Sequence, residues 1–247
     1  MILHKQPPKL ISVLPFKRYS RYSLQSARSL ILYTLYHYPR NASWAIHLML
    51  KELAVDYELA LVDRKSEAQK SADYLRLNPT GRIPTLIHTQ GDSQEVLFES
   101  GAIALYLCEQ HPQSMLLAAQ GTPERAQCYQ WLFYLTATVQ AELMIYFYPQ
   151  RHNQDTSHPE TMVQAQEQRL SAMFAILDGQ IGDRDYVVGN QLTLCDCFLF
   201  MICDWAKNIA KPPMAFPNLA RCLRNLAKRE SFRQVCELEK TDLGLYQ

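Results

Sequence analysis

The stretch NPTGRIPTLIHTQGDSQEVLFESGAIALYLCEQ, residues 78–110, decides the fold. The residue before Pro79 is disfavoured in the helical region, so any helix that precedes it ends there. IPTLIHT and EVLF are rich in β-branched and apolar residues, which predicts two strands, and the polar segment between them supplies the turn. A helix follows from Ser100. The stretch therefore predicts a hairpin and a closing helix.

Strand and helix patterns alternate on the N-terminal side of this stretch. SLILYTLY (29–36) and YELALV (57–62) are predicted as strands. Between them, SWAIHLMLKEL (43–53) places its apolar residues on one helical face, and Ser43 is suited to cap its N-terminus. The polar segment 64–77 is predicted as a connection with a short helix. This order is that of a small α/β sandwich.

The pattern changes on the C-terminal side, after Gln110. Residues 112–123 are predicted as a linker that contains proline and glycine, and no convincing strand follows. Apolar residues recur every four positions along 124–149, which predicts one long helix, and 160–177 forms another. Thr193 to Ile209 is apolar almost all round, as a helix at the centre of a bundle is. The second half is therefore predicted to be all helical.

The composition is that of a globular protein with a sizeable core. The chain has 247 residues, of which 48% are hydrophobic and 20% charged, and its net charge is +1. This excludes a disordered chain and argues against a dedicated nucleic-acid binder. No uncharged apolar run reaches the ~20 residues that a membrane-spanning helix needs. Seven cysteines without paired spacing predict free, buried thiols in a reducing compartment and no structural zinc site.

The first 28 residues differ from the rest in charge. They hold six basic residues and no acidic one, and the first acidic residue of the chain is Glu52. A basic, serine-containing and acid-free composition is that of an organellar transit peptide. We favour a plainer interpretation, a disordered tail or a start codon assigned too early. In either case we expect residues 1–29 to form a basic leader that takes no part in the fold.

Four segments resemble, in order and spacing, the glutathione S-transferase superfamily in its bacterial, beta- or theta-like form with a serine-type loop. They are PRNASWAIHLML (39–50), NPTGRIPTL (78–86), LFESGAIALYL (97–107) and LTLCDCFLF (192–200). The resemblance implies an α/β thioredoxin-like N-terminal domain and an all-α C-terminal domain, the glutathione S-transferase fold. The domains expected from it are the basic leader (1–29), the thioredoxin-like glutathione-binding domain (30–111), a linker (112–123) and the all-helical domain (124–240).

The resemblance also assigns glutathione-binding residues. Pro84 matches the family's cis-proline, and free backbone groups of Ile83 beside it would pair with the cysteinyl backbone of glutathione, as an added strand pairs with a sheet. Glu99 and Ser100 open the helix after the hairpin, where N–H groups and the helix dipole favour a carboxylate. The family places the γ-glutamyl group there, with the Ser100 hydroxyl donating and the Glu99 carboxylate facing the amino group.

Other positions match less closely or have a different role. Lys65 would reach the glycyl carboxylate of glutathione, in a segment that varies within the family. Gln140 stands approximately where beta-type enzymes place a histidine in the long helix, so that contact is altered or absent here. Thr193 and Asp196 match the family's capping box at the start of the buried helix, whose role is in folding rather than chemistry.

The loop after the first strand carries the predicted chemistry. Aligned on Pro39, the bacterial loop P-G-A-C-S places Ala42 at the family's cysteine and Ser43 at the following serine. Without a cysteine there, mixed-disulfide chemistry has no nucleophile. A hydroxyl that donates to the glutathione thiolate would instead lower the thiol pKa from about 8.5. Ser43 is the first candidate for this donor, ahead of Tyr36 and Asn41, although Ser43 could also serve only as a helix cap.

These residues indicate a glutathione transferase-like detoxification enzyme that activates the glutathione thiol for attack on small hydrophobic electrophiles. Two alternatives stay open. One is a non-catalytic member that keeps the fold as an interaction or stress protein, against which the intact Glu99 and Ser100 argue. The other is a glutathione-dependent isomerase, whose Ser-Ser-Cys loop Asn41, Ala42 and Ser43 do not match. We expect a cytoplasmic homodimer with glutathione as co-substrate and no metal, nucleic-acid or membrane partner.

Overall fold

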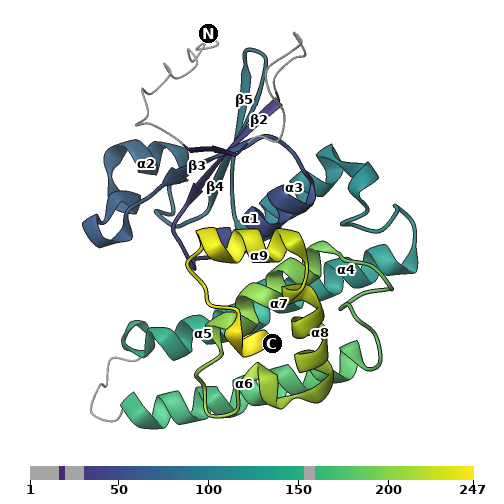
Figure 1. Ribbon diagram of the computed structural model, residues 1–247. Helices are drawn as coiled ribbons and strands as arrows, with labels where there is room; N and C mark the ends of the chain where they lie inside the picture. The colour runs from purple at the N-terminus through teal and green to yellow at the C-terminus, as the bar shows by residue number, and fades with distance from the viewer. Residues whose placement is uncertain (1–16, 20–30, 153–158) are drawn as a thin grey trace.

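A five-stranded mixed sheet forms one end of the molecule (Figure 1). The computed structural model describes residues 17–19, 31–152 and 159–247. In spatial order the strands are β1 (Lys17–Tyr19), β3 (Tyr57–Leu61), β2 (Ile31–His37), β4 (Thr85–Gln90) and β5 (Ser93–Phe98). β2 runs parallel to β3 and antiparallel to β4, and β1 and β5 form the antiparallel edges. The parallel pair requires a crossover connection, which α1 (Ser43–Glu52) provides.

Helices cover both faces of the sheet and then build a separate helical half (Figure 1). α2 (Ala72–Leu77) lies on one face, and α1 and α3 (Ser100–Gln110) lie on the other. The helical half consists of α4 (Pro123–Phe133), a π-helical stretch (Tyr134–Val139), α5 (Gln140–Phe147), α6 (Pro159–Ile181), α7 (Leu194–Trp205), α8 (Pro217–Ala227) and α9 (Glu230–Leu238). α6 lies farthest from the sheet, whereas α7 and α9 contact α1 (Figure 1).

α1 is central because it is covered from both sides. All of its residues from Ser43 to Leu50 are buried. Trp44 packs edge-on against Phe200 of α7, with the ring centroids 5.9 Å apart. Leu35 of β2 belongs to the same hydrophobic core. One core thus runs from the sheet through α1 into the helical half, so the helical half fixes the position of α1 and of the loop before it.

From β2 onward the predicted order of strands and helices is confirmed, with a local difference in the long helix. Residues 124–149 form α4 and α5, but the π-helical stretch Tyr134–Val139 joins them. The sequence does not reveal this stretch because its apolar spacing matches that of an ordinary helix. π-helical stretches are rare and frequently lie at functional sites. The predicted capping box of Thr193 and Asp196 is also confirmed at the start of α7.

Part of the basic leader belongs to the fold, contrary to the prediction that residues 1–29 take no part in it. Lys17–Tyr19 form β1, which pairs with β3 so that Lys17 lies opposite Leu59. Backbone pairing at an open strand edge needs no particular side-chain pattern, so this short strand leaves no signal in the sequence. The other leader residues lie outside the described residues.

The prediction of free, buried thiols is confirmed. All seven cysteines fall within the described ranges, are buried and form no disulfide. Burial raises the pKa of Cys108 to about 12, which keeps its thiol protonated and unreactive. In the described ranges no helix has the length and apolarity to cross a bilayer, and no cluster of three or more His, Cys, Asp or Glu side chains is arranged to hold a metal ion.

Candidate functional site

Three loops meet at one end of the sheet. Tyr36 of β2 pairs with Thr85 of β4, and Thr85 pairs with Phe98 of β5. Neighbouring strands lie about 4.8 Å apart. The loop 38–42 after β2, the segment 82–84 before β4 and the start of α3 after β5 therefore leave the sheet side by side. Most of the residues selected from the sequence lie in or next to these three segments.

The loop 38–42 is a tight turn held by its own polar groups. The Asn41 N–H donates to the Tyr38 carbonyl at 3.1 Å, and the Asn41 side-chain oxygen accepts from the Ala42 N–H at 2.8 Å. Arg40 adopts a φ of 60°, in the left-handed region that a Cβ disfavours. The side-chain oxygen of Asn41 thus shapes the turn that leads into α1.

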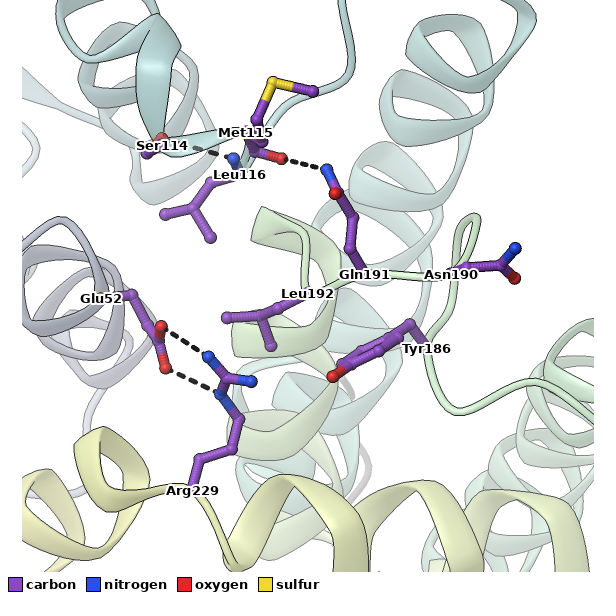
Figure 2. Close-up of a pocket in the computed structure, with 9 residues that line it drawn as sticks. All are labelled: Glu52, Ser114, Met115, Leu116, Tyr186, Asn190, Gln191, Leu192 and Arg229. Carbon is purple, nitrogen blue, oxygen red and sulfur yellow. Dashed lines mark hydrogen bonds and ion pairs between the residues drawn. The ribbon is translucent and has the colours of Figure 1, made fainter.

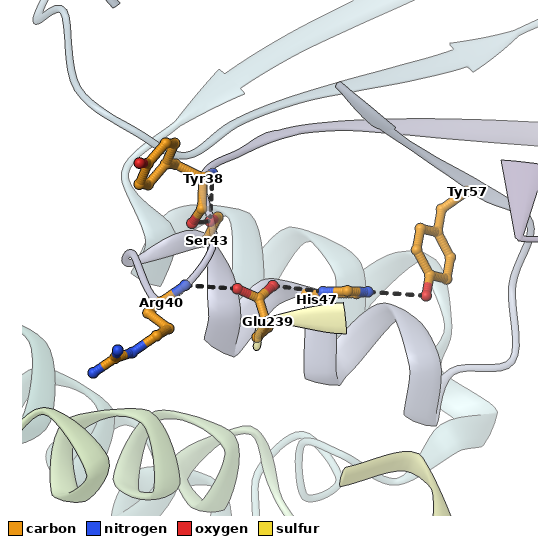
Figure 3. Close-up of polar contacts among 6 residues, drawn as sticks. All are labelled: Tyr38, Arg40, Ser43, His47, Tyr57 and Glu239. Atoms are coloured by element: carbon orange, nitrogen blue, oxygen red, sulfur yellow. Dashed lines mark hydrogen bonds and ion pairs between the residues drawn. The ribbon is translucent and has the colours of Figure 1, made fainter. Parts of the chain in front are cut away.

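Ser43 is the first residue of α1, and its side chain is fully buried. It is not the N-cap that the sequence suggested: Ala42 already has helical backbone angles and takes that position. The Ser43 hydroxyl donates to the Tyr38 carbonyl at 3.3 Å and accepts from the Tyr38 N–H at 3.4 Å (Figure 3). Both distances are long for hydroxyl contacts, so the hydroxyl is weakly held and a stronger acceptor would compete for it.

Tyr36 lies on the face of the sheet that α2 covers. Its ring meets that of Tyr74 edge-on, with centroids 5.9 Å apart, and it packs against a small cluster that includes Val62 and Ile83. Burial raises the pKa of the Tyr36 phenol. The phenol therefore keeps its proton at neutral pH, which suits a hydrogen-bond donor and excludes a general base.

The segment before β4 carries the expected cis peptide bond, between Ile83 and Pro84. The preceding carbonyl, that of Arg82, accepts from the Tyr74 hydroxyl at 2.6 Å and from the Asn78 side-chain amide at 2.8 Å. Within the described part of the chain, neither the N–H nor the carbonyl of Ile83 has a hydrogen-bond partner. The segment is thus held in place and presents free backbone groups.

The junction between β5 and α3 is backbone-strained. Glu99 adopts φ 67° and ψ 111°, unusual for a residue with a side chain, and the Glu99 carboxylate side chain is exposed. Strained backbone of this kind clusters at ligand-binding sites. Ser100 is buried except for 8% of its surface, yet its hydroxyl has no hydrogen-bond partner among the described residues. The start of α3 therefore offers a free hydroxyl next to unpaired helix N–H groups.

Lys65 and Arg64 lie in one exposed turn, and Arg64 rather than Lys65 reaches neighbouring elements of the described chain. Lys65 contributes only its N–H, to the Asp63 carboxylate at 2.9 Å. The Arg64 guanidinium lies 6.0 Å from the centroid of the Tyr38 ring and donates to the Tyr148 hydroxyl at 3.3 Å. Arg64 thus bridges the turn after β2 and the helical half, a contact that no motif in the sequence indicates.

Gln140 begins α5, directly after the π-helical stretch. Its side-chain oxygen is buried and has no hydrogen-bond partner among the described residues. The π-helical stretch faces the start of α3, since a Cβ placed on Gly101 would lie 3.8 Å from the Thr136 hydroxyl. Gln140 follows Thr136 by four residues. A buried amide oxygen without a partner costs free energy, and a ligand or water that donates to it would recover that cost.

A buried polar chain under the loop contains residues that sequence reasoning missed. Glu239, fully buried, accepts from the Arg40 N–H at 2.8 Å, and its other oxygen lies 2.7 Å from Nδ1 of His47 (Figure 3). Nε2 of His47 lies 3.2 Å from the Tyr57 hydroxyl. His47 is fully buried in this chain of contacts. Nothing in the sequence marks Glu239, because its partners are nearly two hundred residues away.

A hollow of about 270 Å³ lies at the opposite end of α1 from Ser43 (Figure 2). Glu52 and Arg229 form a two-pronged ion pair in it, with nitrogen–oxygen distances of 3.0 and 2.9 Å. The other lining residues are Ser114, Met115, Leu116, Tyr186, Asn190, Gln191 and Leu192. None of the candidate site residues from the sequence lines this hollow. Arg229, the basic residue of its lining, is already paired with Glu52.

Two family models match the chain. The model of the glutathione S-transferase N-terminal domain matches residues 32–109, and that of the C-terminal domain matches residues 136–230. The first match spans all three loops described above, and the second begins at Thr136 of the π-helical stretch.

Individual relatives agree with the family models. Glutathione S-transferase GstA of Escherichia coli O157:H7 is 26% identical over 206 residues, covering 83% of this chain and 98% of its own. A glutathione transferase homologue from Sulfitobacter, solved with bound glutathione, is 26% identical, with a TM-score of 0.76 over 84% of this chain and 98% of its own. A sphingomonad glutathione S-transferase, solved in complex with glutathione, is 25% identical, with a TM-score of 0.71 over 85% and 100%.

Proposed function

Because the chain belongs to the glutathione S-transferase family, we propose that it binds glutathione at the end of the sheet where the three loops meet and activates its thiol. One observation carries the proposal. Unsatisfied polar groups of this chain converge there: the Ile83 backbone and the Ser100 hydroxyl lie on segments that leave adjacent strands. Two structures at 25–26% identity that bound glutathione support it.

Each segment would hold one part of glutathione. The free N–H and carbonyl of Ile83, beside Pro84, would pair with the cysteinyl backbone as an added strand. Ser100 and the N–H groups at the start of α3 would bind the γ-glutamyl carboxylate, and the exposed Glu99 carboxylate would face the amino group. The partnerless oxygen of Gln140 makes it a further contact, while Lys65 would serve the glycyl carboxylate from its exposed turn.

The thiolate would then lie near the N-terminus of α1, where the Ser43 hydroxyl could donate to it. A hydrogen bond to an anion is worth about 1.5–3 kcal/mol, enough to lower a thiol pKa of about 8.5 by one to two units. The α1 dipole would add about 0.3–1 kcal/mol. Attack of the thiolate on a small hydrophobic electrophile completes the proposed reaction. Tyr36, with its protonated phenol, and Asn41 are the alternative donors.

Steady-state conjugation of glutathione to a model aryl halide distinguishes these donors. Ser43→Ala should lower kcat at pH 7 by about tenfold or more, with the glutathione affinity nearly unchanged and much of the loss recovered at higher pH. Tyr36→Phe and Asn41→Ala should have smaller effects. If Tyr36→Phe abolishes turnover while Ser43→Ala behaves as wild type, the donor is the tyrosine.

A second candidate function is that of a non-catalytic member of the family. One observation favours it: the Ser43 hydroxyl is fully buried and already bound to the Tyr38 backbone. A protein of this kind would bind glutathione without turning over any model electrophile, and none of the three variants would change its behaviour.

We also propose a cytoplasmic homodimer in which the α/β domain (30–111) of one copy lies against the helical domain (124–240) of the other. Seven unpaired thiols support a reducing compartment. Large apolar side chains are exposed on both halves, including Phe98 at 36% and Phe133 at 57%, and such a pairing would cover both.

A further inference from the structure

The turn before α1 depends on one residue in an unfavourable conformation. Arg40 has a φ of 60° although its side chain carries a Cβ and is exposed to solvent. A non-glycine residue stays in the left-handed region only where its surroundings hold it there. Asn41 and Ser43 follow directly, so their positions depend on the conformation of Arg40.

Side chains of the helical half bind both backbone polar groups of Arg40, its N–H and its carbonyl. The Arg40 N–H donates to the Glu239 carboxylate at 2.8 Å, and the Arg40 carbonyl accepts from the Trp205 indole N–H at 3.0 Å. Glu239 follows the C-terminus of α9, and Trp205 is the last residue of α7. Two elements distant in the sequence therefore fix the backbone of one loop residue, through one acceptor and one donor.

The Glu239 carboxylate is itself fixed in position. It is fully buried, and its second oxygen pairs with Nδ1 of His47 at 2.7 Å. His47 is also fully buried and is anchored at its other nitrogen by the Tyr57 hydroxyl of β3 (Figure 3). The chain Tyr57, His47, Glu239 and Arg40 thus connects the sheet, α1 and the end of α9 to the loop. A buried carboxylate with this many bonds has little freedom to move.

We propose that Glu239 is a positioning residue for thiol activation: it clamps the Arg40 peptide so that the turn presents the α1 N-terminus and Ser43 to the glutathione sulfur. Glu239 reaches the reacting atoms only through this loop, so it is not a catalytic residue. The effect of this clamp on thiol activation rests on the proposed function. The clamp itself, the contact between Glu239 and the Arg40 peptide, is present in the protein without ligand.

Two measurements on the full chain test the clamp separately from the activity. The first is amide hydrogen exchange of the peptide that covers residues 38–43, without ligand. Glu239→Ala should speed this exchange about tenfold or more, while Glu239→Gln, which keeps an acceptor for the Arg40 N–H, should stay close to wild type. Trp205→Phe, which removes only the donor to the Arg40 carbonyl, should speed it to a lesser extent.

The second measurement is the pKa of bound glutathione, followed by thiolate absorbance. Glu239→Ala should raise it by about one unit and lower turnover at pH 7 about tenfold, with the glutathione Kd changed less than about threefold. The matched control is Glu52→Ala, which breaks the ion pair with Arg229 at the other end of α1 and destabilises the fold without touching the loop. It should leave both the exchange and the thiol pKa unchanged.

The outcomes are distinct for the clamp and for the function. If loop exchange in Glu239→Ala equals wild type, or if Glu52→Ala speeds it equally, the clamp is wrong. If exchange speeds up as expected but the bound thiol pKa stays the same, the clamp exists and its role in thiol activation is wrong. If wild type does not bind glutathione, the proposed function fails, and the exchange result still decides whether Glu239 holds the turn. Glu239→Gln and Trp205→Phe keep the test valid should Glu239→Ala not fold.

Discussion

At the scale of single residues, the clearest unsatisfied group next to the loop is His37, the last residue of β2. It is 92% shielded from solvent, its Nδ1 atom is buried, and that atom has no hydrogen-bond partner among the described residues. Its ring lies 6.3 Å from that of His47. Burial lowers the pKa of His37 to about 4, Glu239 opposes this shift and His47 adds to it. His37 is therefore neutral at pH 7 in the folded protein.

Stability should fall as the pH is lowered because of this histidine. The unfolded chain binds a proton at His37 near pH 6.5 and the folded chain only near pH 4, so the free energy of unfolding decreases between these values. The loss due to His37 should be about 2 kcal/mol at pH 5. Urea denaturation at pH 7 and pH 5 measures it, and His37→Gln should lack this part of the loss. An equal loss in His37→Gln would show that other groups cause it, and His152→Gln, at an exposed position, is the control.

Ser100 should matter for ligand binding more than for stability. Its hydroxyl has no partner among the described residues, so Ser100→Ala should change the unfolding free energy by less than about 0.5 kcal/mol. If the hydroxyl binds the γ-glutamyl carboxylate, its loss should weaken glutathione binding by about 1–3 kcal/mol, or about five- to 150-fold. Titration calorimetry and thermal melting of the same variant measure the two effects. An unchanged Kd would show that glutathione does not bind at the start of α3.

At the scale of elements, the sequence predicted the features that are determined by residues close together in the chain. The hairpin, α1, α3 and the cap of α7 follow from residue spacing, turn residues and the Thr193–Asp196 pair. β1 and the π-helical stretch were not predictable in this way. β1 pairs by backbone alone, and a π-helical stretch differs from an α-helix in its hydrogen bonds and not in its apolar residues.

The cap of α7 should be among the more sensitive points of the fold. The fully buried Asp196 carboxylate accepts from the Val187 N–H at 2.8 Å and from the Thr193 N–H at 2.7 Å. Asp196→Ala would leave both N–H groups buried without a partner, so it should lower the unfolding free energy by about 2–4 kcal/mol. Urea denaturation measures this. Asp242→Ala, which removes an exposed carboxylate that also accepts a backbone N–H, should cost less than about 1 kcal/mol. Equal losses would contradict this assignment.

At the scale of the whole molecule, the candidate site depends on both halves of the chain. The motifs singled out Ile83, Pro84, Glu99 and Ser100, and the structure brings these residues to one end of the sheet through the register of β4 and β5. They did not indicate Glu239 or Trp205, because side-chain contacts between distant segments leave no periodicity in the sequence. The hydrogen bond between the Ser43 hydroxyl and the Tyr38 backbone was not predicted either, although the two residues are only five positions apart.

The proposed dimer can be tested on one exposed side chain. Phe133 of α4 is 57% exposed in the single chain, and the proposed pairing would cover it. Sedimentation at micromolar concentration should give the mass of two chains, and Phe133→Glu should shift it towards one. A monomer mass for the wild type would reject the dimer. Ile176→Glu, on α6 far from the sheet, is the control and should stay dimeric.

We propose that this chain binds glutathione as the thiolate, and titration of the bound thiol measures this property itself. Free glutathione thiol titrates near pH 8.5, and a hydrogen bond from Ser43 with the α1 dipole should bring the bound thiol to about pH 6.5–7.5. We predict saturable binding with one site per chain and thiolate absorbance already present at pH 7. Bound glutathione that still titrates near pH 8.5, or the absence of saturable binding at about 10 mM glutathione, well above a millimolar Kd, would show that the chain does not bind the thiolate.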